Sequence, residues 1–240
     1  MHSLKMGARR IARWIMKNTV VSRESLTPEI ALRLITETCP LWMATPDKCP
    51  FPNPYWAFYW PGGQAATRYI LDNKKEFSGK TVFDFGAGCG SASIASAMVG
   101  TRSIANDIDS VITVALVSIA LNYRLNKLSD ANVQYTNKNF LSPMEIDNFP
   151  KDSIIVLGDM FYDTDFTELT LKWLARLQKE RGTRALVGDP DRHPMADRNY
   201  AKSYSVKFSR IPLVDYPLPD YIIREHYGFN TAKVYELVFN

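Results

Sequence analysis

The sequence contains only three cysteines and three histidines among 240 residues. They are scattered, and no Cys-x-x-Cys or His-x-x-x-His pair occurs. This absence argues against a zinc site and against a disulfide framework, so we predict no bound metal and a reducing compartment. Apolar runs long enough to span a membrane are also missing, and we predict no stable membrane insertion.

Acidic residues are absent from the first 23 positions, which carry six basic side chains. The remaining 23 basic and 25 acidic residues give the rest of the chain a net charge of −2, although the whole chain has +4. With this slightly negative net charge, residues 24–240 lack the excess of basic residues that is typical of a nucleic-acid-binding protein. We therefore predict no nucleic-acid partner.

Residues 1–23 form a distinct basic segment in which Leu4, Ala8, Ile11 and Ile15 recur at helical spacing. An arginine-rich, acid-free amphipathic N-terminus is typical of a mitochondrial transit peptide. We predict that residues 1–23 are such a segment and that the protein is located in the mitochondrial matrix. The alternatives are a solvated basic helix of a cytosolic protein and a peripheral membrane anchor.

The other 217 residues, 24–240, are predicted to form one α/β domain, because 46% of the chain is hydrophobic and strand patterns alternate with helix patterns. Residues 24–78 form an N-terminal extension, with a predicted helix that begins at Thr27 and Pro28. The alternation predicts a doubly wound, mostly parallel sheet. The last two strands, over 202–211 and 231–239, are expected to form a hairpin without a helix, with one strand antiparallel to the sheet.

A glycine-rich turn follows the first predicted strand of the sheet, in "DFGAGCG" from Asp84 to Gly90. Gly86, Ala87 and Gly88 let the backbone turn sharply and approach a ligand at the start of a helix. The spacing differs from the dinucleotide pattern G-x-G-x-x-G. Asp84 is placed to bind amides of the turn.

Polar residues end the next two predicted strands. Asp107 lies about 20 residues beyond the glycine turn, where an acid binds the ribose hydroxyls of an adenosine. Asp109 is predicted to cap the following helix. Asn137 is placed either to contact an adenine edge or to occupy an ordinary turn. These features indicate a nucleoside-cofactor pocket without separating NAD from S-adenosylmethionine.

The segments "YWAFYWPGGQA", "DFGAGCGSASIA", "ANDID" and "LGDMFYD" together resemble the seven-β-strand protein lysine methyltransferases. The resemblance implies a Rossmann-like class I fold of seven strands with an antiparallel C-terminal strand, and S-adenosyl-L-methionine as cofactor. It also implies the cofactor-binding residues Trp60, Gly86, Ala87, Gly88, Asp107, Asn137 and Gly158.

The signature acid-x-x-aromatic of that group falls on Asp159 to Tyr162, so the resemblance implies that Asp159 and Tyr162 are catalytic. We expect Asp159 to orient the incoming lysine. We expect aromatic rings, Phe161 and Tyr162 with Tyr59 and Trp60, to favour its neutral amine and to hold cationic sulfonium and ammonium groups. The alternative is that Asp159 caps the helix near Glu168, although Asp163 or Asp165 is better placed for this. The absence of proline after Asp159 argues against methylation of nucleic-acid bases or of glutamine.

The branch of the group that the chain resembles acts on the β-subunit of electron transfer flavoprotein, so the implied substrate is that protein and the implied role is modulation of electron transfer from dehydrogenases. The alternatives are a different protein substrate and a non-catalytic cofactor-binding module. We expect a monomer.

Overall fold

The computed structural model describes residues 2–45, 49, 51, 54–108, 114–142, 145–197, 203–226 and 228–240, with side chains from Gly7 onward. Asp109, predicted to cap a helix, lies outside the described residues. The helices are α1 (His2–Asn18), α2 (Pro61–Asp72), α3 (Lys74–Phe77), α4 (Ser91–Met98), α5 (Val114–Leu125), α6 (Thr164–Arg181), α7 (His193–Ala196) and α9 (Asp220–Glu225), with short 3-10 turns at Tyr55–Ala57 and Asp130–Asn132. The strands are β1 (Val20–Ser22), β2 (Leu32–Leu34), β3 (Thr81–Phe85), β4 (Arg102–Asn106), β5 (Val133–Thr136), β6 (Ile154–Gly158), β7 (Arg184–Asp189), β8 (Phe208–Pro217) and β9 (Thr231–Phe239).

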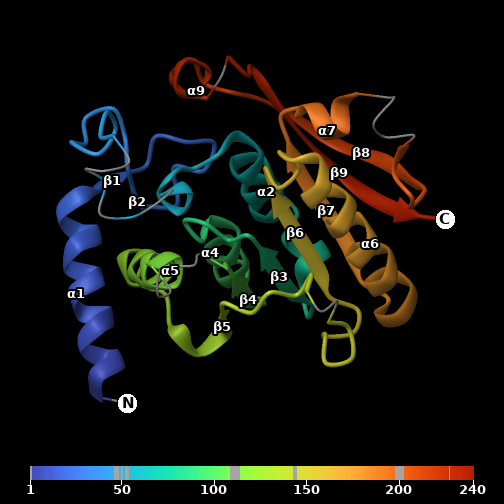
Figure 1. Ribbon diagram of the computed structural model, residues 1–240, viewed down its shortest axis with the longest axis horizontal. Coiled ribbons are helices and arrows are strands. Elements are labelled where there is room, and N and C mark those ends of the chain that lie inside the picture. Colours follow the sequence, from blue (N-terminus) through green and yellow to red (C-terminus); the bar gives the residue numbers. More distant parts are fainter. Residues whose placement is uncertain are drawn as a thin grey trace.

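The described chain forms a seven-stranded sheet in the order β5-β4-β3-β6-β7-β9-β8 (Figure 1). The strands from β3 to β7 pair in parallel, and β9 runs antiparallel to both β7 and β8. The predicted mostly parallel, doubly wound sheet is therefore confirmed. Strand order reverses between β3 and β6, and ligands of such sheets bind outside the carboxyl ends of the strands at this switch point.

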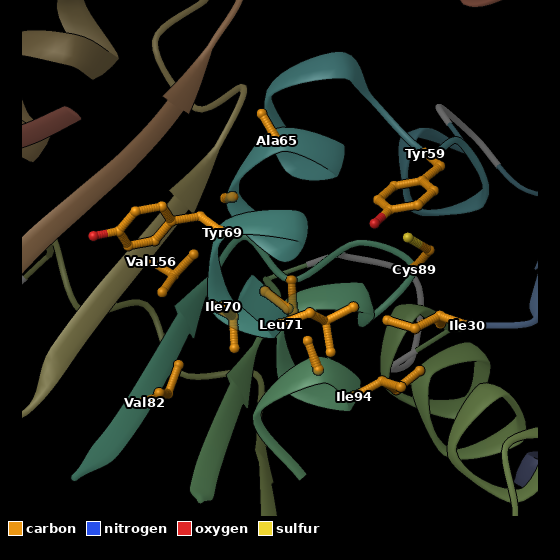
Figure 2. Close-up of a cluster of buried hydrophobic side chains, with 14 of the residues drawn as sticks. Ile30, Tyr59, Ala65, Tyr69, Ile70, Leu71, Val82, Cys89, Ile94 and Val156 are labelled. Carbon is orange, nitrogen blue, oxygen red and sulfur yellow. The ribbon is translucent and has the colours of Figure 1, made fainter. Parts of the chain in front are cut away.

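Helices cover both faces of the sheet because its central strands are buried on both sides. On one face α2 packs on β6 and β7, α4 on β3 and β4, and α5 on β4; Figure 2 shows Ile70 and Leu71 of α2 in this layer together with Val82 and Ile94. On the other face α6 packs through Trp173, which is fully buried with the aromatic side chains of β3. The layers hold the carboxyl ends of β3 and β6 in fixed positions.

The predicted helix at Thr27 is wrong: residues 28–30 form a turn, and Leu32–Leu34 forms strand β2, which pairs with β1. Long-range side-chain hydrogen bonds supply the reason. Asn126 accepts a hydrogen bond from the Ala31 N–H and donates one to its carbonyl, and Asn122 accepts one from the Arg33 N–H. These bonds replace the helical ones, so the tertiary environment overrides the local capping signal.

The C-terminal hairpin differs from the prediction in two ways. The strand expected over 202–211 begins at Phe208 and continues to Pro217, with an irregularity between Pro212 and Val214. Proline is tolerated there because β8 is the edge strand. The connection to β9 contains α9, which follows Pro219 and buries Ile222, whereas we expected no helix.

Helix α1 packs against α5, at the side of the domain farthest from β8 (Figure 1). Ile15 is fully buried, and the Trp14 ring contacts the Phe51 ring edge-on at 5.6 Å. Ile15 belongs to a cluster with Val114 and Ala115 of α5. A cut after residue 23 would expose this cluster to water.

Candidate functional site

The glycine turn joins β3 to α4 at the switch point of the sheet. Gly86 and Gly88 adopt positive φ angles of 67° and 52°, which L-residues other than glycine rarely adopt. The Gly88 N–H donates to the Asp107 carboxylate at 2.9 Å, so the predicted ribose acid lies directly against the turn. Asp84 was expected to bind amides of the glycine turn, but its carboxylate accepts hydrogen bonds from the N–H and the hydroxyl of Ser93, in the first turn of α4.

Asn137 is exposed immediately after β5, one strand farther out than Asp107. The buried Asn106 supports this turn, because its amide donates to the carbonyls of Thr136 and Lys138 on either side of Asn137. The Asn106 carbonyl also accepts from the Ala87 N–H at 2.8 Å. One buried amide residue thus joins the glycine turn to the turn that carries Asn137.

Helix α2 begins on top of the carboxyl ends of β6 and β7, where three glycines permit backbone contact. A Cβ atom on Gly158 would lie 2.5 Å from Gly63 Cα, and one on Gly62 would lie 2.6 Å from the Gly188 carbonyl carbon. Gly158, predicted to bind cofactor, is therefore placed against α2. The close approach sets the position of Trp60, which directly precedes the helix.

Asp159 lies beneath this helix start and is 5% exposed. Its carboxylate accepts hydrogen bonds from the N–H groups of Gly62 and Gly63, at the positive end of the α2 dipole. It also forms an ion pair with Arg192 at 2.6 Å. Burial raises the pKa of the Asp159 carboxyl, while Arg192 and the two N–H groups oppose the rise. The helix that follows Asp159 is capped by Asp163, as its position predicted.

Trp60 lies at the centre of an aromatic and cationic group. Its ring is 6.2 Å from the Tyr55 ring, 5.7 Å from the Phe58 ring and 5.3 Å from the His226 ring. The Arg192 guanidinium lies 5.6 Å from the Trp60 ring and 5.5 Å from the Phe229 ring. Arg192 therefore joins the buried Asp159 to the aromatic group by an ion pair and cation–π contacts.

The predicted aromatic channel is formed in part. Tyr162 is 61% exposed, and partial burial of its phenol raises the pKa of that group, with smaller contributions from Asp163, Tyr55 and Asp107. Phe161 is fully buried in the α6-side core, so its assignment to the channel is wrong. The hydroxyl of the buried Tyr59 is hydrogen-bonded to Thr27 at 2.9 Å. Of the other predicted rings, Tyr162 lies near Asp107, and Trp60 contacts Tyr55.

Sequence reasoning missed three residues of this region: Arg192, His226 and Asp189. Asp189 ends β7, and its Oδ1 atom accepts from the Arg192 N–H at 2.7 Å. Burial, followed by the nearby Asp159 charge, raises the Asp189 pKa to about 7. The position of "GDP" at the end of a buried strand was the signal available, since polar residues at carboxyl ends of parallel strands line ligand sites.

His226 gives a prediction about pH. Burial, with a smaller effect from Arg192, lowers its pKa to about 4. Because the unfolded imidazole titrates near the ordinary value of 6.5, its contribution to stability is present above that pH and is lost as the pH falls towards 4. The free energy of unfolding is expected to fall by about 2 kcal/mol more in the unaltered protein than in His226→Gln between pH 7 and pH 5, measured by urea denaturation. An equal fall in the free energy of unfolding of the two proteins over this pH range would contradict the prediction.

The profile of the lysine methyltransferase family matches residues 57–205, which include the glycine turn, Asp107 and Asp159. Among curated proteins, a Caenorhabditis elegans electron transfer flavoprotein beta subunit lysine methyltransferase homolog is 54% identical, covering 98% of this chain and 99% of the relative. The Mus musculus and Homo sapiens electron transfer flavoprotein beta subunit lysine methyltransferases are 42% and 39% identical, covering 93% and 94% of this chain and 82% and 81% of the relatives.

Solved structures show the same fold at low identity. Magnesium protoporphyrin IX methyltransferase from Synechocystis with bound SAH matches with a TM-score of 0.52 and 15% identity, covering 75% of this chain and 84% of that one. At this identity the likeness concerns the arrangement of the sheet and its helices.

Proposed function

The chain belongs to the lysine methyltransferase family, and from this premise we propose that it transfers methyl groups from S-adenosyl-L-methionine to lysines of the β-subunit of electron transfer flavoprotein. The observation that carries the proposal is the 54% identity to the C. elegans homolog along nearly the full length of both chains. The relatives from mouse and human carry the same substrate in their names.

The residues at the glycine turn fit the cofactor. A Cβ atom on Gly88 would meet nothing closer than Trp56 Cα at 3.8 Å, so the missing side chain leaves room above the turn. Asp107 is fixed beside that space by its hydrogen bond to Gly88, where a carboxylate accepts hydrogen bonds from ribose hydroxyls. Gly86, Ala87 and Gly88 would hold the methionine and ribose portions, Asn137 the adenine, and Trp60 the methionine end.

S-adenosylmethionine, when bound, supplies an electrophilic methyl group on a sulfonium. The protein's task is to align a lysine and to present its amine without a proton. Trp60, Tyr55 and Tyr162 form an apolar surround that disfavours the charged ammonium. In this proposal Tyr162 contacts the lysine, and Asp159 contributes by orienting it or by holding the surround in place through α2 and Arg192.

We place the reaction in the mitochondrial matrix, because the named substrate is a mitochondrial flavoprotein and residues 1–23 have the composition of a transit segment. No helix in the described residues is long and apolar enough to cross a membrane. Since Ile15 is buried against α5, the protein is best assayed as the full chain.

The test is to incubate the chain with electron transfer flavoprotein and isotopically labelled S-adenosylmethionine, and to locate the label by mass spectrometry. We expect a labelled lysine on the β-subunit. The matched control is Asp107→Ala, which should bind the cofactor about 30-fold more weakly in calorimetry, because a charged hydrogen-bond acceptor of the ribose is lost.

Three other outcomes have distinct meanings. Label on a different protein contradicts the substrate and leaves the chemistry intact. Cofactor binding without any labelled protein contradicts catalysis. Unchanged cofactor binding in Asp107→Ala contradicts the assignment of the pocket.

A further inference from the structure

A cavity of about 370 Å³ lies beside the site, between the β1–β2 hairpin and α9. We call it the acidic cleft. Its walls are formed by Val20–Glu24, Leu34–Thr38, Phe58, Tyr59, Gln64, Tyr221, Glu225 and His226. These segments come from the end of the basic segment 1–23, from the N-terminal extension and from the connection between β8 and β9, so the cleft lies outside the sheet that carries the glycine turn.

Carboxylates dominate the charge of the acidic cleft. Glu24, Glu37 and Glu225 line it, and they lie close enough for Glu37 and Glu24 to add to the effect of burial in raising the Glu225 pKa. Arg224 opposes this rise more weakly. Arg23 is the one basic residue among those lining the cleft, and its guanidinium donates to the carbonyls of Pro28 and Glu29. Among the described lining residues, three acids therefore accompany one arginine, whose guanidinium is already hydrogen-bonded.

Two polar side chains on the wall have unused hydrogen-bonding capacity. His226 is 5% exposed and lines the cleft, and its imidazole makes no hydrogen bond among the described residues. The Tyr221 hydroxyl is buried and likewise has no hydrogen-bond partner within the described chain. For the Tyr221 hydroxyl, burial without a partner costs about 1–3 kcal/mol, so a ligand that hydrogen-bonds to it would relieve this cost.

The acidic cleft adjoins the aromatic group around Trp60. His226 and Phe58 line the cleft, and both rings lie within 6 Å of the Trp60 ring. Tyr55, which is close to Tyr162, also contacts Trp60. Trp60 thus contacts both cleft-lining rings and Tyr55. The cleft and the surroundings of Tyr162 are therefore connected through one group of aromatic side chains.

We propose that the acidic cleft is a substrate-docking subsite that binds a second basic side chain, lysine or arginine, of the protein whose lysine is methylated. This rests on the proposed function for the identity of the substrate class. An ammonium or guanidinium group placed between Glu24, Glu37 and Glu225 removes their mutual repulsion and gains charge-assisted hydrogen bonds. The subsite selects lysines that have a basic neighbour on the substrate surface.

The test compares the unaltered chain with Glu37→Gln/Glu225→Gln in binding a fluorescent pentalysine peptide, measured by anisotropy in the presence of S-adenosylhomocysteine. We expect the dissociation constant to rise about tenfold in the variant and its salt dependence to decrease. The matched control is Glu180→Gln, which removes an acid from an exposed ion pair on α6 and should leave binding unchanged. Equal binding by all three proteins overturns the proposal.

Kinetics with electron transfer flavoprotein separate this inference from the proposed function. The double variant is expected to raise KM for the flavoprotein while kcat and cofactor affinity stay within about twofold. An unchanged KM at full activity overturns the subsite. If the unaltered chain does not methylate the flavoprotein, the substrate assignment fails. The pentalysine experiment still shows whether the acidic cleft binds basic side chains. Gln is isosteric with Glu, and thermal unfolding verifies that the variants are folded.

Discussion

Asp159→Asn is expected to lower the free energy of unfolding by about 3 kcal/mol and to reduce kcat for lysine methylation about 100-fold or more. The carboxylate joins the N–H groups at the start of α2 to the Arg192 guanidinium in a buried position. Removal of its charge leaves a largely buried cation without its partner, which is costly in a protein interior. Because Trp60 precedes α2 and contacts Arg192, the aromatic surround of the lysine loses its support.

The measurements are urea denaturation, single-turnover methylation of the flavoprotein and calorimetry with S-adenosylmethionine. The matched comparison is a double-mutant cycle with Arg192→Gln, in which Asp159→Asn should cost much less once Arg192 is already neutral. A 100-fold loss of kcat without a loss of stability would show that Asp159 acts on the lysine itself and not through α2 and Arg192.

Gly62→Ala is expected to destabilise the fold by about 3 kcal/mol or more. The added Cβ atom would lie 2.6 Å from the Gly188 carbonyl carbon and 2.7 Å from the Asp159 Oδ2 atom. Both neighbours are fixed, one as backbone of β7 and the other by its ion pair, so α2 must move away from the sheet. Trp60 would move with it.

Gly63→Ala is the control for this prediction, because its Cβ atom would meet nothing closer than the Tyr59 ring at 3.9 Å. In this helix alanine is favoured over glycine by up to about 1 kcal/mol, so the control should be neutral or stabilising. Thermal unfolding of the two variants measures the difference. Equal melting temperatures would show that the contact of α2 with β7 is not as close as described.

The sequence was sufficient where the relevant interactions are local or follow from the order of strands. Alternating strand and helix patterns predicted the parallel sheet, and the carboxyl ends of its strands placed Gly88 and Asp107 together, as their hydrogen bond shows. The same reasoning offered Asp163 or Asp165 as the cap of α6, because an N-cap is a contact between near neighbours in the chain, and Asp163 is the residue that caps it.

Long-range packing decided the remaining features. The capping signal at Thr27 and Pro28 failed because Asn122 and Asn126 of the α5 region, nearly a hundred residues away, bind the backbone of Ala31 and Arg33. Phe161 and Tyr162 are adjacent in sequence, yet one is fully buried in the core on the α6 side of the sheet, and the other is exposed and stacks on Phe166 of α6.

The sequence by itself therefore determined the sheet, the glycine turn and the acid beside it, because period and spacing specify these. Only the tertiary structure brought Asp159 under the start of α2, set Arg192 between two aromatic rings, and assembled the acidic cleft from segments some 200 residues apart. Such contacts have no signature in sequence spacing, because they depend on where separate elements meet after the core has packed.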